Sequence, residues 1–320
     1  MKQVLGIISA LCMLGFVHAS PVHAETKLVV GDVAPLSAAW PSYVAAEKGL
    51  FRAQGLDASI IYAGSAANVV QQLIGGAFDI GLSTFDTAVR AAAGGAPIAV
   101  IGATTVKYPY SIMVAPEIKS ARDLRGKTII LPFQKDITTV LWNRWLKDQG
   151  VDPASVDQVY DGASANRFAA LSAKRVQAAF LGAPFDLRAQ QDGYGKLLDY
   201  SNYAKGFPFT VVIVRRDWLR DHEDTARHFL AALAASEKWI TNEANRDEAS
   251  DVLARATKQS KDLALQTYDY FVKEAGVFNP ELRFPADAAT TVGQVLVDLG
   301  DIRSVSAVPA DLIDFRLLGQ

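Results

Sequence analysis

The sequence predicts an α/β protein of two similar lobes, each a mostly parallel sheet flanked by helices, and two observations support this prediction. From Lys27 onward, short apolar runs alternate with amphipathic stretches, the pattern of β-α units in a mostly parallel sheet. The segment AGSAANVVQQLIGGAFDIGLST also resembles DGASANRFAALSAKRVQAAFLGA, 98 residues further on. Both segments have the same order of loop, helix, turn, buried strand and loop, as expected of a duplicated architecture.

The first predicted lobe begins with three strand and helix pairs. Its predicted strands span residues 27–31, 58–62, 78–82 and 98–103, and its first helix spans residues 40–48 and ends at Gly49. Gly64 and Ser65 introduce the next helix, whose apolar residues recur at helical spacing and form one stripe: Ala66, Val69, Val70, Leu73 and Ile74. Gly75 and Gly76 end that helix, Ser83 or Thr84 caps the following one, and Gly94 and Gly95 end it.

The same pattern restarts after Tyr110 and predicts the second lobe. Strands are expected at residues 111–115 and 128–131, with a capping box formed by Ser120 and Asp123 between them. Asp136 is placed to cap a helix over residues 137–148, Gly150 lies beyond its end, and Asp152 with Pro153 starts a short helix.

The remaining chain is expected to return to the first lobe. Residues 209–216 read as a strand, and helices follow at residues 225–242, 247–257, 262–274 and 287–299, which we expect to pack on the first lobe and the rear of the molecule. The chain then crosses between lobes at residues 106–110 and 207–209, and two crossings form a hinge. We therefore expect one lobe at residues 25–108 with 209–320 and the other at residues 109–208.

The N-terminal segment, residues 1–24, is typical of a signal peptide. Lys2 precedes an apolar run over residues 4–17, and the small residues Val22 and Ala24 bracket a cleavage site. The run is shorter than the roughly 20 residues that a membrane span requires. We expect export to the periplasm with cleavage after Ala24, in preference to a second site of the same form after Ala19.

Residue composition argues against several classes of function. Cys12 is the only cysteine and lies in the predicted signal peptide, so we expect no disulfide, thiolate metal site or cysteine nucleophile in the exported chain. His222 and His228 are six residues apart and would lie on different faces of a helix, so we expect neither a metal site nor a catalytic triad. We also expect no cofactor. The 32 basic residues are outnumbered by 34 acidic ones, which argues against nucleic-acid binding.

Several segments then resemble a known family in order and spacing. PSYVAAEKGLFRAQGLDASIIYAGSAANVVQQLIGGAFDIGLST, SARDLRGKTIILP, QGVDPASVD and AKRVQAAFLGAPF are similar to the periplasmic solute-binding proteins of the sulfonate, taurine and nitrate type. The resemblance implies a two-lobed type II periplasmic-binding fold, a small-molecule ligand in the cleft, an inner-membrane ABC permease as partner, and a monomer. Helix N-termini that follow the strands would suit a sulfonate or carboxylate.

The matching loops supply the predicted ligand-binding residues. Those of the first lobe are Ser37, Ala39, Trp40, Gly64, Ser65, Ala66, Ser83, Thr84 and Phe85. Those of the second lobe are Phe133, Gln134, Lys135, Thr138, Asp161, Arg167 and Phe185, the last preceded by Pro184. Each serine or threonine is equally well explained as a simple helix cap.

The second lobe departs from the family pattern at Phe133 to Asp136, where relatives commonly have glycine and small hydroxyl residues. We expect Trp40, Phe85, Phe133 and Phe185 to form flat walls around the ligand, with Lys135 or Arg167 opposing its acid group. An aromatic or aliphatic carboxylate or a sulfonate fits this arrangement. The alternative for the four aromatic residues is core packing.

The function predicted from the sequence is therefore capture of a small organic anion for an ABC importer, without catalysis. One alternative is an enzyme, because the wider family includes pyrimidine-forming proteins of thiamine synthesis, although their cysteine-rich motif and active-site histidine are missing. A hydrolase using Asp86, Asp136 or Asp161 is a further enzymatic alternative. A ligand sensor on the same fold is the third.

Overall fold

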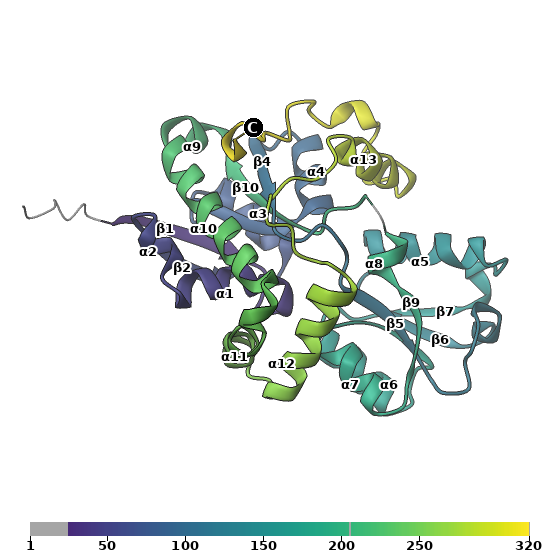
Figure 1. Cartoon of the computed structure of the whole chain (residues 1–320). Coiled ribbons are helices and arrows are strands. Elements are labelled where there is room, and N and C mark those ends of the chain that lie inside the picture. The colour runs from purple at the N-terminus through teal and green to yellow at the C-terminus, as the bar shows by residue number, and fades with distance from the viewer. Residues whose placement is uncertain (1–24, 205, 320) are drawn as a thin grey trace, which may run out of the picture.

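The computed structural model describes residues 25–204 and 206–319, and they form two α/β bodies side by side (Figure 1). The first lobe carries the first sheet and the second lobe carries the second. Between β4 and β5 the chain passes from the first sheet to the second, and it returns ahead of β10. The predicted signal peptide lies outside the described residues.

The first sheet has five strands in the order β2-β1-β3-β10-β4. β1 pairs in parallel with β2 and β3, whereas β10 runs antiparallel to β3 and β4, so the sheet is mostly parallel as predicted. The bounds are β1 Thr26–Asp32, β2 Leu56–Tyr62, β3 Ile80–Thr84, β4 Ile98–Ala103 and β10 Thr210–Arg215. The helices around it are α1 Trp40–Glu47, α2 Leu50–Ala53, α3 Ala66–Ile74, α4 Phe85–Ala93 and α9 Arg216–Asp221.

The second sheet repeats this plan in the order β7-β6-β8-β5-β9. β6 is parallel to β7 and β8, and β5 is the antiparallel strand that takes the place of β10. The bounds are β5 Tyr110–Val114, β6 Thr128–Leu131, β7 Asp157–Tyr160, β8 Ala178–Gly182 and β9 Gly195–Asp199. The helices are α5 Ile137–Asp148, α6 Ser164–Ser172, α7 Phe185–Gln191 and α8 Tyr200–Tyr203.

The internal repeat is confirmed by the structure. α3 starts at residue 66 and α6 at residue 164, and β3 starts at residue 80 and β8 at residue 178, so helix and strand keep the predicted offset. β3 and β8 occupy the same place, the centre of their five-stranded sheets, next to β1 and β6 respectively. The two lobes therefore present equivalent strand ends.

Most predicted elements are confirmed, and the differences have local causes. The strand predicted at residues 78–82 starts at Ile80, because the Phe78 ring instead fills the space left by Gly31, where an added Cβ would lie 2.1 Å from it. Ile74, assigned to the apolar stripe of α3, is 40% exposed, so the buried stripe ends at Leu73. The helix predicted to residue 274 becomes a π-helix at Asp269–Glu274.

The C-terminal helices were expected on the first lobe and the rear of the molecule, and they also pack against the second lobe. α10 Glu223–Thr241 and α11 Arg246–Thr257 lie against α1 of the first lobe. α12 Lys261–Tyr268 contacts α7 of the second lobe, and α13 Ala288–Asp298 packs on α4 and reaches α5. These contacts make the C-terminal region a strap across the junction between lobes.

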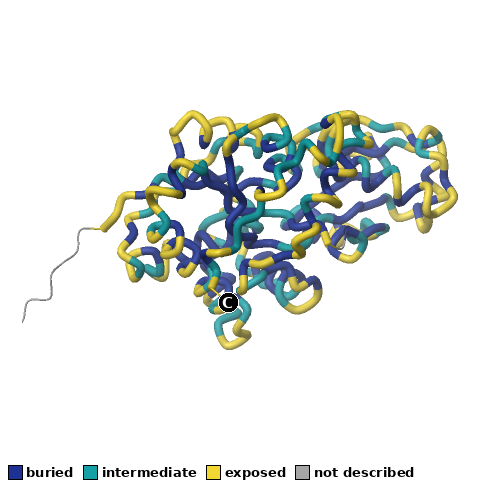
Figure 2. Tube along the Cα trace, turned by 90° about the horizontal axis from the view of Figure 1, so that it is seen from above, coloured by how far each residue is buried: buried dark blue, intermediate teal, exposed yellow. Residues whose placement is uncertain are grey.

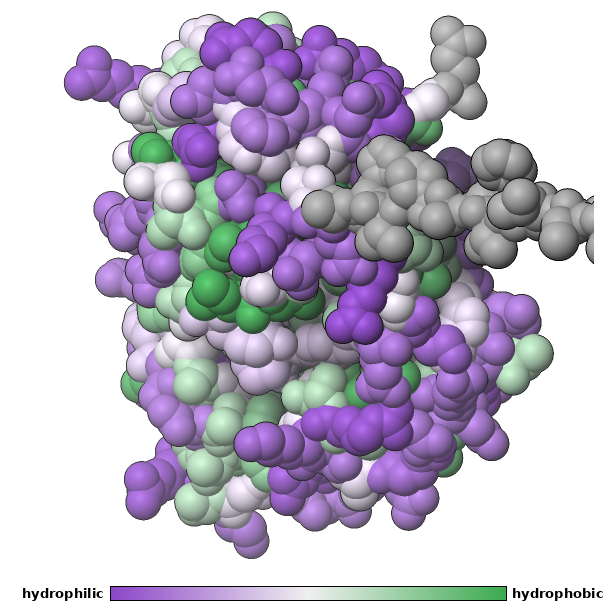
Figure 3. Space-filling model, turned by 90° about the vertical axis from the view of Figure 1, so that its left-hand side faces the viewer, coloured by the Kyte–Doolittle hydropathy of each residue, from purple (hydrophilic) through white to green (hydrophobic). Residues whose placement is uncertain are grey.

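Burial is concentrated on the strands of each lobe, with exposed residues in the outer turns (Figure 2). Hydrophilic side chains dominate the outer face of the first lobe, around a few hydrophobic ones (Figure 3). Among the described residues, no helix combines the length and the apolar character needed to span a membrane.

Candidate functional site

A small pocket, here called the cleft pocket, lies where the strand ends of the two lobes meet. The loop after β1 supplies Ser37, the strand β5 supplies Tyr110, and the start of α6 supplies Ser164. Phe185 after β8 and Phe271 of the π-helix complete its apolar side. Its free volume of about 20 Å³ is close to the space that one water molecule needs.

The lobes are in contact at this pocket. The Ser37 hydroxyl donates a hydrogen bond to the Ala183 carbonyl oxygen at 3.3 Å, which joins the loop after β1 to the loop after β8. A ligand of ordinary size needs a pocket of roughly 300 Å³ or more, so its entry requires the lobes or the lining side chains to move. The structure therefore represents a closed arrangement of the cleft.

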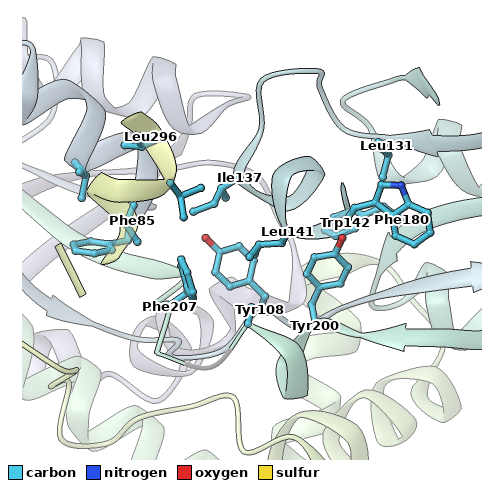
Figure 4. Packing of buried hydrophobic residues seen from close by; sticks show 14 of the residues in the cluster. Phe85, Tyr108, Leu131, Ile137, Leu141, Trp142, Phe180, Tyr200, Phe207 and Leu296 are labelled. Carbon is cyan, nitrogen blue, oxygen red and sulfur yellow. The ribbon is translucent and has the colours of Figure 1, made fainter. Parts of the chain in front are cut away.

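A separate apolar interface also joins the lobes (Figure 4). Phe85 of α4 and Leu296 of α13 face Ile137 and Leu141 of α5 across this interface. All four belong to one continuous cluster of buried residues. Tyr108 of the crossing segment lies between them, and its hydroxyl has no hydrogen-bond partner among the described residues. Both lobes therefore contribute buried apolar side chains to one cluster at this contact.

Two of the four aromatic residues that were predicted to surround the ligand lie in the core. Trp40 is fully buried, donates from Nε1 to the Ala249 carbonyl at 3.0 Å, and packs edge-on against Tyr268. Phe85 is fully buried against Phe284. Protein atoms enclose both rings in this structure and neither ring lines the cleft pocket, so contact of these two residues with the ligand stays a prediction. Ala39, next to Trp40, is buried as well.

The loops after β2 and β3 lie together in the first lobe. Ser65 caps α3, because its side chain accepts a hydrogen bond from the Asn68 backbone N–H at 3.1 Å. Ser83 donates to the Ala66 carbonyl at 3.1 Å, which links the two loops. The Thr84 hydroxyl lies 2.8 Å from that of Thr87 and does not cap the backbone of α4. Gly64, with a φ of +83°, makes the turn before α3.

In the second lobe the residues after β6 are more exposed. Phe133 is 57% exposed, and its ring covers Gly162, whereas Gln134 and Lys135 lie on the surface. Asp136 caps α5 as predicted and accepts a hydrogen bond from the Thr138 N–H at 2.8 Å. Burial and the nearby Asp86 carboxylate raise the pKa of Asp136.

Arg167 has a structural role that the sequence did not indicate. Its buried guanidinium donates to the Phe180 and Asp161 carbonyl oxygens, both at 2.6 Å, and to the Ser164 hydroxyl at 2.7 Å. These bonds tie α6 to β8 and use all three guanidinium nitrogens. In this structure the guanidinium therefore serves the fold, and its predicted contact with an acid group of the ligand stays a prediction. The Asp161 carboxylate, in turn, is held by the Ala163 N–H at 2.8 Å, and this bond lowers its pKa.

A larger pocket, here called the seam pocket, lies between α7 and the turn from α11 to α12. Its volume is about 580 Å³, and Phe185 belongs to the linings of both pockets. Arg188, Lys258 and Asp262 are the charged side chains of its lining. This pocket could not be predicted from the sequence, because α7 and the α11–α12 turn are some 70 residues apart in the chain. The only available signal was Arg188, one turn after the predicted residue Phe185.

Two buried carboxylates lie near the strand ends. Asp32, at the end of β1, and Asp186, in the first turn of α7, are at most 5% exposed, and each has one carboxylate oxygen without a hydrogen-bond partner among the described residues. Burial raises the pKa of each to about 7. Within the described part of the chain, no group of three or more histidine, cysteine or acidic residues is arranged to hold a metal ion.

Comparison with known proteins places this chain in a family. Residues 38–246 match the family model described as NMT1/THI5 like. The chain belongs to the NMT1/THI5-like family. This NMT1/THI5-like chain is also 27% identical over 231 residues to "Putative binding protein YtlA" of Bacillus subtilis (strain 168), which covers 69% of this chain and 68% of YtlA.

Two solved structures show that the NMT1/THI5-like chain has the fold of periplasmic binding proteins. The alkanesulfonate-binding protein SsuA from Xanthomonas axonopodis pv. citri has a TM-score of 0.72 at 17% identity, over 90% of this chain and 98% of SsuA. The periplasmic nitrate-binding protein NrtA from Synechocystis PCC 6803 has a TM-score of 0.75 at 15% identity, over 91% of this chain and 87% of NrtA. The predicted two-lobed α/β fold is thereby confirmed.

Proposed function

We propose that this protein is the exported ligand-binding component of an ABC importer. It captures a small organic anion, a sulfonate or an aromatic or aliphatic carboxylate, between lobes divided at residues 108 and 208, and delivers it as a monomer to an inner-membrane permease. The similarity to YtlA, SsuA and NrtA supports a binding role. Secretion by a signal peptide cleaved after Ala24 belongs to the same proposal.

One observation supports this function most strongly. The two sheets have equivalent strand orders, and loops at their strand ends are in contact. The Ser37 hydroxyl of one lobe donates a hydrogen bond to the Ala183 carbonyl oxygen of the other. A guest held between these loops touches both lobes, so it stabilises the closed state relative to the open one. Binding without chemistry is the role this arrangement supports best.

A thermal-shift screen tests the proposal. Purified protein is heated with sulfonates, aromatic acids, nucleobase-like compounds and inorganic oxyanions, each beside a neutral analogue. A ligand at 100 times its Kd stabilises the folded state by about 2.7 kcal/mol, so we expect at least one organic acid to raise the melting temperature more than its analogue does. We also expect that acid to be recovered unchanged after incubation with the protein.

Two results would contradict the proposal. If no compound in the screen raises the melting temperature, capture of this ligand class is refuted. If the stabilising compound is converted to product, the protein is an enzyme.

A further inference from the structure

We propose that the seam pocket binds the acid group of the ligand through Arg188 and Lys258. This inference rests on the proposed function and assigns its anion recognition to residues outside the predicted site. Lys135 is on the surface, the Arg167 guanidinium is used by backbone and hydroxyl oxygens, and the cleft pocket has no charged side chain in its lining. The acid group therefore needs a different cationic partner.

The seam pocket has a suitable size and position. Its volume of about 580 Å³ lies in the range of roughly 300–1,000 Å³ that is usual for small-molecule sites. One side is α7 of the second lobe and the other is the α11–α12 turn, and a 2.9 Å hydrogen bond from Gln191 to Gln266 connects them. Since Phe185 lines both pockets, an apolar body in the cleft and an acid group in the seam would share this ring as a wall.

Both cations of the seam pocket are available. Arg188 is held with its guanidinium carbon 5.3 Å from the centre of the Phe168 ring, and Lys258 follows the last residue of α11. Within residues 25–204 and 206–319, neither side chain forms an ion pair, although many other arginines and lysines do. A planar guanidinium donating to a carboxylate or sulfonate gives a strong, directed contact.

Two further side chains of the lining, Gln259 and Asp262, bear on the charge and polarity of the seam pocket. The side-chain amide nitrogen and oxygen of Gln259 are buried without a hydrogen-bond partner among the described residues. Asp262, in the first turn of α12, is the opposing charge. With two cations and one carboxylate, the lining favours a singly charged organic acid.

Calorimetric titration with benzenesulfonate, and with benzenesulfonamide as the neutral match, tests this inference. We expect Arg188→Gln and Lys258→Gln each to weaken benzenesulfonate binding by about tenfold or more, and to leave the sulfonamide affinity unchanged. Asp262→Asn should tighten benzenesulfonate binding, because it removes the repelling carboxylate. Arg52→Gln and Lys147→Gln, at exposed positions on α2 and α5, are the matched controls and should bind as the parent does.

Several results would overturn the inference. They are a parent protein that does not bind benzenesulfonate, an Arg188→Gln variant that binds it as tightly as the parent, and equal losses for sulfonate and sulfonamide. Unliganded melting temperatures verify that each variant is folded. If a compound from the thermal-shift screen stabilises the parent and Arg188→Gln equally, the proposed function stands and only this inference fails, whereas a screen without any stabilising compound removes both.

Discussion

At the scale of single residues, burial decides which polar groups serve the fold and which remain for a ligand. Arg167 lies in α6, the helix after β7, where a ligand-binding arginine could lie, yet its guanidinium donates its hydrogen bonds to Phe180, Asp161 and Ser164. Nothing in the local sequence distinguishes it from Arg188, which is exposed and unpaired within the described chain. The two arginines differ in burial, since Arg167 is 2% exposed and Arg188 lies on the surface.

Aromatic residues show the same limit of sequence reasoning. Trp40 and Phe85 begin helices at strand ends, where ligand contact and core packing are both compatible with the pattern. Their surroundings come from the C-terminal segment, through Tyr268 and Phe284, more than 190 residues away in the chain. The predicted caps Ser65 and Asp136 are correct because a cap depends only on residues two or three positions away.

Asp186 makes the stability of the protein depend on pH. Burial raises its pKa from 3.8 to about 7, while Lys196 lowers it and Asp199 raises it to a smaller extent. In the folded state the carboxyl group therefore keeps its proton up to about pH 7, whereas the unfolded chain releases it near pH 4. The stabilisation is complete below about pH 4 and is lost as the pH rises to about 7.

We predict that Asp186→Asn removes this contribution. The amide oxygen can still accept the hydrogen bond that the Leu187 N–H donates at 2.9 Å, and the group no longer ionises. The variant should be more stable than the parent at pH 8, by a few kcal/mol at most, and similar to it at pH 4. Urea unfolding across this pH range measures the difference. A difference that does not vary with pH would show that Asp186 does not titrate as described.

At the scale of elements, strong periodic segments were predictable and weak edge strands were not. β4, β6 and α5 have the predicted bounds, because continuous apolar runs and a helical stripe mark them. β7 and β9 were not predicted. They are the edge strands of the second sheet, with the sequences DQVY and GKLLD, and their exposed positions leave no clear alternation.

The cap of α3 gives an element-scale prediction. Ser65→Ala removes the acceptor for the Asn68 N–H, so we expect the free energy of unfolding to fall by about 1 kcal/mol. Ser65→Asp keeps an acceptor and should retain the stability of the parent. Equilibrium urea unfolding of the three proteins is the measurement. If Ser65→Ala were as stable as the parent while binding its ligand more weakly, Ser65 would serve the ligand and not the helix.

At the scale of the whole molecule, the repeat predicted two lobes, but their junction depends on contacts between distant segments. The C-terminal strap joins the lobes through α12 against α7 and through α13 between α4 and α5. The π-helix adds Tyr270, whose hydroxyl donates to the Asp199 carboxylate of the second lobe at 3.1 Å. Local patterns do not encode such pairings, which explains why the seam pocket was missed.

Closure of the two lobes on a ligand is tested most directly by a distance distribution between spin labels. Because Cys12 is the only cysteine, Arg52→Cys on α2 and Lys147→Cys on α5 provide unique label sites in a chain that begins at Glu25. Without ligand we predict a broad distribution, and with a saturating compound from the thermal-shift screen a narrow one at a shifted distance. Identical distributions with and without that compound would contradict closure of the two lobes on the ligand.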